Sequence, residues 1–313
     1  MSVVALCGGI GGAKLALGLY TELAAGELTI IGNTGDDFTH LGLAISPDLD
    51  TVCYTLSGLA DQTRGWGRGD ESWNFMEAMR QLGGPDWFNL GDRDLALHAL
   101  RTEALRQGQS LTEVTAGVVR QFGITATLLP MSDDPVRTMI ATPGGWLAFQ
   151  EYFVRERCAP PVVGVHYDGA AAARANTAAL AVLADPAVEA IVICPSNPVL
   201  SIDPILAVPG MRAALAKAPA PVVAVSPLIG GAAVKGPTAE IMREMGLGVS
   251  ASSVCAHYGD LLDGFVLDEA DAQEHGKLPV PTAVTRTLMT TLDDRVSLAR
   301  FTLDFASALR GAR

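Results

Sequence analysis

The chain has 313 residues and a formal net charge of −12, and it is 49% hydrophobic and 18% charged. This composition is typical of a folded protein with a large core and argues against disorder. No lysine and arginine cluster forms the basic face that nucleic-acid binding requires, so we expect no nucleic-acid partner. The N-terminus lacks the charged start of a signal peptide and no apolar run reaches the ~20 residues of a membrane span, so we expect a cytoplasmic protein that does not engage membranes.

The N-terminus has the pattern with which a doubly wound α/β fold begins. An apolar run at Ser2–Cys7 is followed by the glycine-rich segment Gly8-Gly9-Ile10-Gly11-Gly12 and by a helical pattern from Ala13. Backbone N–H groups of such a turn can face a phosphate, and Lys14 adds a cation. The segment is neither a complete dinucleotide fingerprint nor a P-loop, and by itself it also fits close packing of a strand on a helix.

Four carboxylates follow the next predicted strand, at residues 28–31. They lie in Gly32-Asn33-Thr34-Gly35-Asp36-Asp37 and Ser46-Pro47-Asp48-Leu49-Asp50-Thr51. Ligands bind at the carboxyl ends of parallel strands, and clustered carboxylates usually require a cation. We therefore predict Asp36 and Asp50 as Mg²⁺ ligands, with Asp37 and Asp48 as outer groups or turn residues. A solvated acidic loop is the alternative.

The alternation of strands and helices weakens after residue 51 and returns after residue 159. We predict a Rossmann-like, doubly wound α/β core with a mostly parallel sheet, formed by residues 1–50 and 160–313. Residues 51–159 are predicted to form a smaller inserted α+β lobe. Within the lobe, the capping box Ser110-Leu111-Thr112-Glu113 predicts the start of a helix, and Pro143-Gly144-Gly145 predicts a hairpin turn.

Two later predicted strands, at residues 190–194 and 222–225, end in polar loops. Because the carboxyl ends of parallel strands share one edge, we expect Ser196, Asn197 and Ser226 to line a nucleotide pocket there. Lys235, just before the next predicted helix, is a further candidate cation. His98 is interpreted as structural because no nucleophile motif accompanies it.

Taken together, the motifs resemble those of the 2-phospho-L-lactate transferase family, which builds the deazaflavin coenzyme F(420). The resemblance covers essentially the whole chain. Besides the glycine-rich and acidic segments, it rests on Val52-Cys53-Tyr54, Leu90-Gly91-Asp92-Arg93-Asp94-Leu95-Ala96, Leu129-Pro130-Met131-Ser132-Asp133-Asp134, Phe149-Gln150-Glu151, Pro195-Ser196-Asn197-Pro198, Ser201-Ile202 and Val225-Ser226-Pro227.

The resemblance implies a homodimeric, magnesium-dependent transferase with a Rossmann-like core. Its donor would be a guanosine diphosphate-linked three-carbon acid, a derivative of phospholactate, phosphoenolpyruvate or 3-phosphoglycerate. Its acceptor would be the deazaflavin Fo, whose ribityl hydroxyl attacks the acid-proximal phosphorus while GMP leaves.

The family's functional positions carry over residue by residue. Asp36 and Asp50 would be catalytic and hold the metal. Asp50, Asn89 and Arg93 would bind Fo, although relatives often have lysine where Asn89 stands. The donor phosphates would face Gly9, Gly11, Gly12, Lys14 and Asn33, and the guanosine would face Ser196, Asn197 and Ser226.

Two other functions remain open at this point. Nucleotide-sugar-binding regulatory proteins of the gluconeogenesis-factor type resemble this chain at its glycine-rich start. The glycine-rich turn alone also fits a nicotinamide-dependent oxidoreductase, but its fingerprint is incomplete. The motifs at residues 46–54 and 90–96 favour the transferase, because a regulator has no need to bind Fo.

Overall fold

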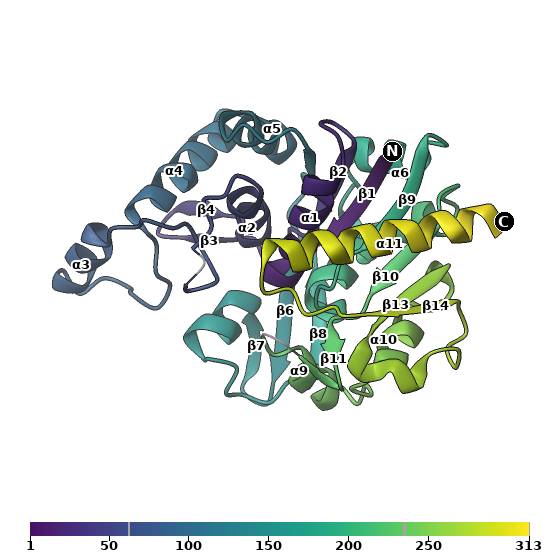
Figure 1. The fold of residues 1–313 in the computed structure, drawn as a ribbon. Helices are drawn as coiled ribbons and strands as arrows, with labels where there is room; N and C mark the ends of the chain where they lie inside the picture. Colours follow the sequence, from purple (N-terminus) through teal and green to yellow (C-terminus); the bar gives the residue numbers. More distant parts are fainter. Residues whose placement is uncertain (62, 234–235, 313) are drawn as a thin grey trace.

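The computed structural model describes residues 1–61, 63–233 and 236–312, so the candidate cation Lys235 lies outside the described residues. Within them, one seven-stranded sheet forms the centre of the molecule (Figure 1). Its strands are all parallel, which confirms the predicted α/β class. In spatial order they are β14 (Thr282–Thr285), β13 (Gly264–Asp268), β10 (Val222–Val225), β9 (Val188–Ile193), β1 (Ser2–Cys7), β2 (Leu28–Gly32) and β5 (Thr127–Pro130).

Helices cover both faces of the sheet, because successive side chains of each central strand point to opposite sides. In β1, Val3 and Ala5 join one hydrophobic cluster, whereas Val4 and Leu6 join another. The first cluster includes residues of α1 (Gly9–Glu22), α2 (Pro47–Leu56), α5 (Leu111–Gln121) and α11 (Leu292–Ala312). The second includes residues of α6 (Thr177–Leu183), α7 (Asp203–Ala207), α8 (Met211–Ala216), α9 (Thr238–Glu244) and α10 (Ala251–Tyr258).

Smaller elements surround the carboxyl edge of the sheet. They are the hairpin β3 (Phe38–His40) with β4 (Leu43–Ile45), the helices α3 (Asn74–Gln81) and α4 (Asp92–Arg106), and the antiparallel sheet of β7 (Gly145–Ala148), β6 (Arg137–Thr142) and β8 (Gly164–Asp168). A two-stranded ribbon joins β11 (Leu228–Ile229) to β12 (Ala232–Ala233), and a π-helical turn spans Glu151–Arg155. No helix within the described ranges has the length and apolar character needed to cross a membrane.

The predicted boundary at residues 51–159 does not follow the sheets. β5 falls inside this range but pairs with β2 at the edge of the main sheet. β8 follows the range but pairs with β6 in the small antiparallel sheet. Strand patterns show where a strand occurs but not which partner it pairs with, so the sequence alone did not place these two strands.

The glycine-rich segment belongs largely to helix α1, which begins at Gly9 rather than at the predicted Ala13. Gly9 has a φ of +64°, a conformation that favours glycine. A Cβ atom at Gly11 would lie 2.5 Å from the Pro195 carbonyl oxygen, and one at Gly12 would lie 2.3 Å from Ser196 Oγ. These glycines therefore let the first turn of α1 approach the loop that follows β9.

Candidate active site

A cavity of about 690 Å³ opens where four neighbouring strands end. Gly8 follows β1, Asp36 follows β2, Pro195 follows β9 and Ser226 follows β10, and all four residues line it. This is the edge at which parallel α/β sheets bind ligands. The volume lies within the usual range for small-molecule sites, roughly 300–1,000 Å³.

Most of the predicted site residues meet in this cavity. The lining includes Gly9, Gly11, Lys14, Asp36, Asp50, Asn89, Ser196, Asn197 and Ser226. The other three predicted residues do not line it. Gly12 lies against Ser196, and Asn33 is buried behind the cavity wall. Arg93 is exposed on α4, where its backbone N–H donates to Glu71.

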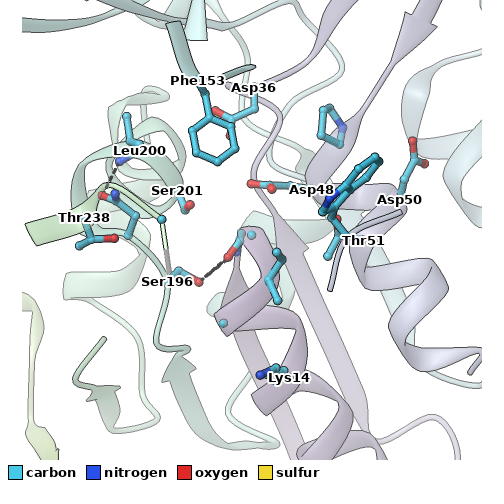
Figure 2. A pocket seen from close by; sticks show the side chains of 18 of the residues that line it. Lys14, Asp36, Asp48, Asp50, Thr51, Phe153, Ser196, Leu200, Ser201 and Thr238 are labelled. Atoms are coloured by element: carbon cyan, nitrogen blue, oxygen red, sulfur yellow. Dashed lines mark hydrogen bonds between the residues drawn. The ribbon is translucent and has the colours of Figure 1, made fainter. Parts of the chain in front are cut away.

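Two carboxylates, Asp36 and Asp48, face the cavity from separate segments (Figure 2). Burial raises the pKa of Asp36 well above its ordinary value, and the negative charges of Asp48 and Asp37 raise it further. Asp36 Oδ1 is buried and has no hydrogen-bond partner among the described residues. Such an atom is costly to bury alone, and a cation would satisfy it.

Asp48 accepts a hydrogen bond from Asn33, which the family resemblance placed at the donor phosphates. Asn33 Nδ2 donates to Asp48 Oδ2 at 2.9 Å and to the Leu200 carbonyl at 3.3 Å. Burial raises the pKa of Asp48 to about 6, and the hydrogen bond from Asn33 opposes the rise. Asn33 therefore positions a carboxylate in the structure. Asp48, which was predicted as an outer group, is directly on the cavity.

Asp50 has a different environment, because it forms a buried ion pair with Arg101. Arg101 Nη1 donates to Asp50 Oδ2 at 3.0 Å, and Arg101 Nη2 bonds the other carboxylate oxygen. Both side chains are almost completely buried. A carboxylate whose two oxygens are already paired is a weaker candidate for a metal ligand than Asp36 or Asp48. Asp50 as a metal ligand stays a prediction.

A chain of polar side chains extends from Asp50 along α4. His98 Nδ1 lies 3.7 Å from Asp50 Oδ2, and His98 Nε2 lies 3.2 Å from Asp94 Oδ2. Tyr54 donates its hydroxyl to Asp94 Oδ1. His98, interpreted as structural from the sequence, in fact lines the cavity together with Asp94 and Tyr54. The helical spacing of Asp94, His98 and Arg101, at i, i+4 and i+7, puts them on one face of a helix, and the sequence analysis did not use this signal.

The predicted guanosine residues line the cavity, but their polar atoms are partly engaged. Ser196 Oγ donates to the Gly8 carbonyl at 2.8 Å and accepts from the Gly8 N–H at 3.2 Å (Figure 2). Ser226 Oγ closes a turn with the backbone of Leu228. Asn197 Oδ1 caps the following helical turn, while its buried Nδ2 has no partner within the described ranges. Asn197 Nδ2 is thus a donor ready for a ligand.

Aromatic side chains border the wider part of the cavity. Phe153 is 40% exposed and stacks on Phe149, with ring centroids 5.4 Å apart and an interplanar angle of 13°. Trp66 is 47% exposed and carries Arg64 above its ring, 5.1 Å from the centroid. Exposed aromatic rings beside a cavity offer apolar faces to a planar ligand.

The carboxylates fit a magnesium ion that also binds a phosphorylated substrate. No group of three or more histidine, cysteine or acidic residues arranged to hold a metal occurs in the part of the chain that the structure describes. Mg²⁺ takes one or two carboxylates and completes its shell with water and phosphate oxygens. Asp36, with its unpartnered oxygen, and Asp48 supply that number.

The parallel sheet and the cavity at its carboxyl edge define a Rossmann-like α/β protein with a ligand site. The family model described as 2-phospho-L-lactate transferase CofD matches residues 3–286. A phosphoenolpyruvate transferase of Kitasatospora aureofaciens is 43% identical over 99% of both chains. A 2-phospho-L-lactate transferase of Methanosarcina mazei is 41% identical over 95% of this chain and 98% of its own.

The structural comparison agrees with the fold. A crystal structure of a UPF0052 family protein from Bacillus halodurans has a TM-score of 0.63 at 14% identity and covers 97% of this chain and 100% of its own. The chain belongs to the CofD family of phospholactate and phosphoenolpyruvate transferases of coenzyme F(420) biosynthesis. The resemblance noted from the sequence is confirmed.

Proposed function

We propose that this protein transfers a phospho-three-carbon acid from a guanosine diphosphate-linked donor to the deazaflavin Fo, with Mg²⁺, and releases GMP. The observation that carries the proposal is the pairing of two buried carboxylates, Asp36 and Asp48, with the glycine-rich start of α1 in one cavity. Phosphoryl-type transfer depends mainly on positioning and on neutralisation of phosphate charge.

In this proposal, each part of the cavity binds one group of the substrates. Gly9, Gly11 and Lys14 bind the diphosphate, because α1 directs its first N–H groups there. Asn197, with its unpartnered Nδ2, binds the guanosine, beside Ser196 and Ser226. Asp36 and Asp48 hold the magnesium ion, which when bound neutralises phosphate charge.

The acceptor lies on the aromatic side of the cavity. Phe149 and Phe153 face the planar deazaflavin, and Asp50 and Asn89 lie beside it. Asn89 Oδ1 already accepts from Arg80 at 3.0 Å, so its free amide hydrogens are the groups that remain for Fo. The ribityl oxygen then bonds to the acid-proximal phosphorus, the bond from that phosphorus to the GMP oxygen breaks, and the hydroxyl proton is lost.

The identity of the three-carbon acid is proposed from the relatives and from the family resemblance. Phosphoenolpyruvate transferases and 2-phospho-L-lactate transferases match this chain at similar identity. We therefore propose either acid, or 3-phosphoglycerate, as the donated group. The proposed homodimer rests on the family resemblance, and light scattering of the purified protein tests it.

Fluorescence titration of the purified protein with Fo tests the proposed function. Saturable binding that tightens with Mg²⁺ and GDP is expected, because the cavity holds both substrates and the metal together. Arg106→Ala serves as a comparison variant and should leave Fo binding unchanged, since its exposed side chain pairs with Glu103 and does not line the cavity. Absence of Fo binding under all these conditions would contradict the proposal.

A further inference from the structure

A smaller cavity of about 110 Å³ lies beside the main one. Both cavities are lined by Ile10, Lys14, Thr51, Tyr54, Trp66 and Gly67. The smaller cavity, called the side pocket below, is therefore next to the glycine-rich start of α1. Its volume is too small for a nucleotide or a deazaflavin but suffices for a small charged group.

The residues that line the side pocket include a buried cation, Arg295, on the first turn of α11. Its side chain is only 8% exposed, and its Nε has no hydrogen-bond partner among the residues described. A guanidinium stays charged in proteins, and a buried charged donor without an acceptor is costly. The N-terminus of a helix is also an unfavourable place for a cation. Arg295 forms no ion pair among the described residues, and the negative charge that acts on it is that of its neighbour Asp294.

Two cations, Lys14 and Arg295, line the side pocket. Lys14 Nζ donates to the carbonyl of Met289, a residue of the main cavity, at 3.0 Å. Asp61 is the acidic residue of the lining, and its carboxylate pairs with Arg64 at 2.8 Å. Asp61 also accepts from two backbone N–H groups, so its charge is already compensated. An incoming anion would meet Lys14 and Arg295.

We propose that the side pocket binds the carboxylate of the donated three-carbon acid, with Arg295 and Lys14 as its hydrogen-bond donors. The assignment rests on the proposed function, because Ile10 and Lys14 also border the place given to the diphosphate. In the donor, the carboxylate is only a few bonds from the phosphorus, so the two groups require adjacent subsites. Paired guanidinium and ammonium donors suit a carboxylate in such a site.

Two ligands that differ only at this group test the proposal. In isopropyl phosphate, a methyl replaces the carboxylate of 2-phospholactate. Calorimetric titration of the full chain should show that Arg295→Met weakens 2-phospholactate binding at least about 10-fold and changes isopropyl phosphate binding less than about 2-fold. The control is Arg300→Met, which removes an exposed arginine of the same helix that pairs with Glu22. It should change neither affinity.

Several outcomes would overturn the assignment. Equal loss for both ligands would show that Arg295 binds the phosphate, and unchanged affinity for 2-phospholactate would remove Arg295 from the site. Thermal melting excludes a merely structural role, because a variant that removes an unpartnered buried cation should melt no lower than wild type. A lower melting temperature with the preference for 2-phospholactate retained would likewise overturn the assignment.

The proposed function can fail separately. If wild type does not transfer the acid to Fo but distinguishes the two ligands through Arg295, the proposed function is wrong and the carboxylate subsite stands. If wild type carries out the transfer but Arg295→Met still prefers 2-phospholactate, the proposed function stands and the carboxylate subsite is wrong.

Discussion

Arg101 binds both carboxylate oxygens of Asp50, although the two residues are 51 positions apart in the chain. The pair joins α4 to α2 at the cavity, which Asp50 lines, and both side chains are almost completely buried. A buried charge that loses its partner is strongly destabilising, whereas a neutral pair in the same place is often tolerated. Asp50 is therefore fixed in position by the fold before any substrate binds.

The Arg101→Met variant should be less stable than wild type by about 3–5 kcal/mol, because it leaves the Asp50 carboxylate buried and unpaired. Adding Asp50→Asn to Arg101→Met should recover much of the loss, since no charge then remains. Urea unfolding of the two single variants and the double variant measures this coupling. Strictly additive free-energy changes would show that the pair does not interact.

The metal-free protein should lose stability as the pH rises from about 4 to about 7. Burial raises the pKa of Asp37 to about 7 and that of Asp48 to about 6, from an ordinary value of 3.8. A carboxyl group that binds its proton more tightly in the folded state favours folding when protonated, and this advantage disappears above the folded pKa. The free energy of unfolding, measured in the presence of a chelator across this pH range, tests the prediction.

The Asp37→Asn variant should flatten that pH dependence, because it removes the group with the pKa of about 7. Adding Mg²⁺ above neutral pH should raise wild-type stability, since the ion binds the folded carboxylates. The same addition should have a smaller effect on Asp36→Asn. If the stability of Asp37→Asn depends on pH as that of wild type does, the buried Asp37 carboxyl group is not a source of the pH dependence.

Gly12→Ala should destabilise the protein by about 1–3 kcal/mol, the usual cost of overpacking. The new Cβ would lie 2.3 Å from Ser196 Oγ and 2.9 Å from Cys7 Sγ. A second change, Ser196→Ala, should restore part of the loss. Gly117→Ala on α5 is the matched control, because its new Cβ would meet only the Arg120 side chain, at 4.0 Å. It should stabilise the helix by up to about 1 kcal/mol.

The Phe153→Leu variant should weaken Fo binding while leaving GDP binding unchanged, because the stacked ring faces the aromatic side of the cavity. A reduction in Fo affinity of about 10-fold corresponds to one lost aromatic contact. Trp146→Leu is the control, since that ring is 58% exposed and is not among the residues lining the cavity. If both variants bind Fo as wild type does, the deazaflavin lies elsewhere.

Local sequence signals predicted much of the fold. The apolar run of β1 and the polar loop after β9 are where their patterns indicate, and Ser110 and Glu113 form the predicted capping box. These features depend on neighbouring residues only. The edge strand β14 was missed, because its four residues lie close to prolines and lack a clear apolar alternation. Partner choice for β5 and β8 depends on contacts far along the chain.

In the candidate site too, local sequence signals predicted some features, whereas others depend on contacts between distant segments. Segments that follow strands were expected at one edge, and the structure brings Asp36, Ser196 and Ser226 to one cavity. The ion pair of Arg101 with Asp50 was not predicted, because it depends on how α4 packs beside α2. The hydrogen bond from Asn33 to Asp48 was not predicted for a similar reason. The sequence around an asparagine that follows a strand does not show whether its amide binds a ligand or another side chain.

Turnover by wild type and by Asp36→Asn measures the proposed transfer itself. Each protein is incubated with Fo, Mg²⁺ and each guanosine diphosphate-linked three-carbon acid in turn, and mass spectrometry follows GMP and the phosphodiester of Fo. We expect wild type to form both products in equal amounts with at least one donor and Asp36→Asn to form neither while remaining folded. No product from wild type with any donor would contradict the proposed transfer to Fo, and undiminished turnover by Asp36→Asn would remove Asp36 from the site.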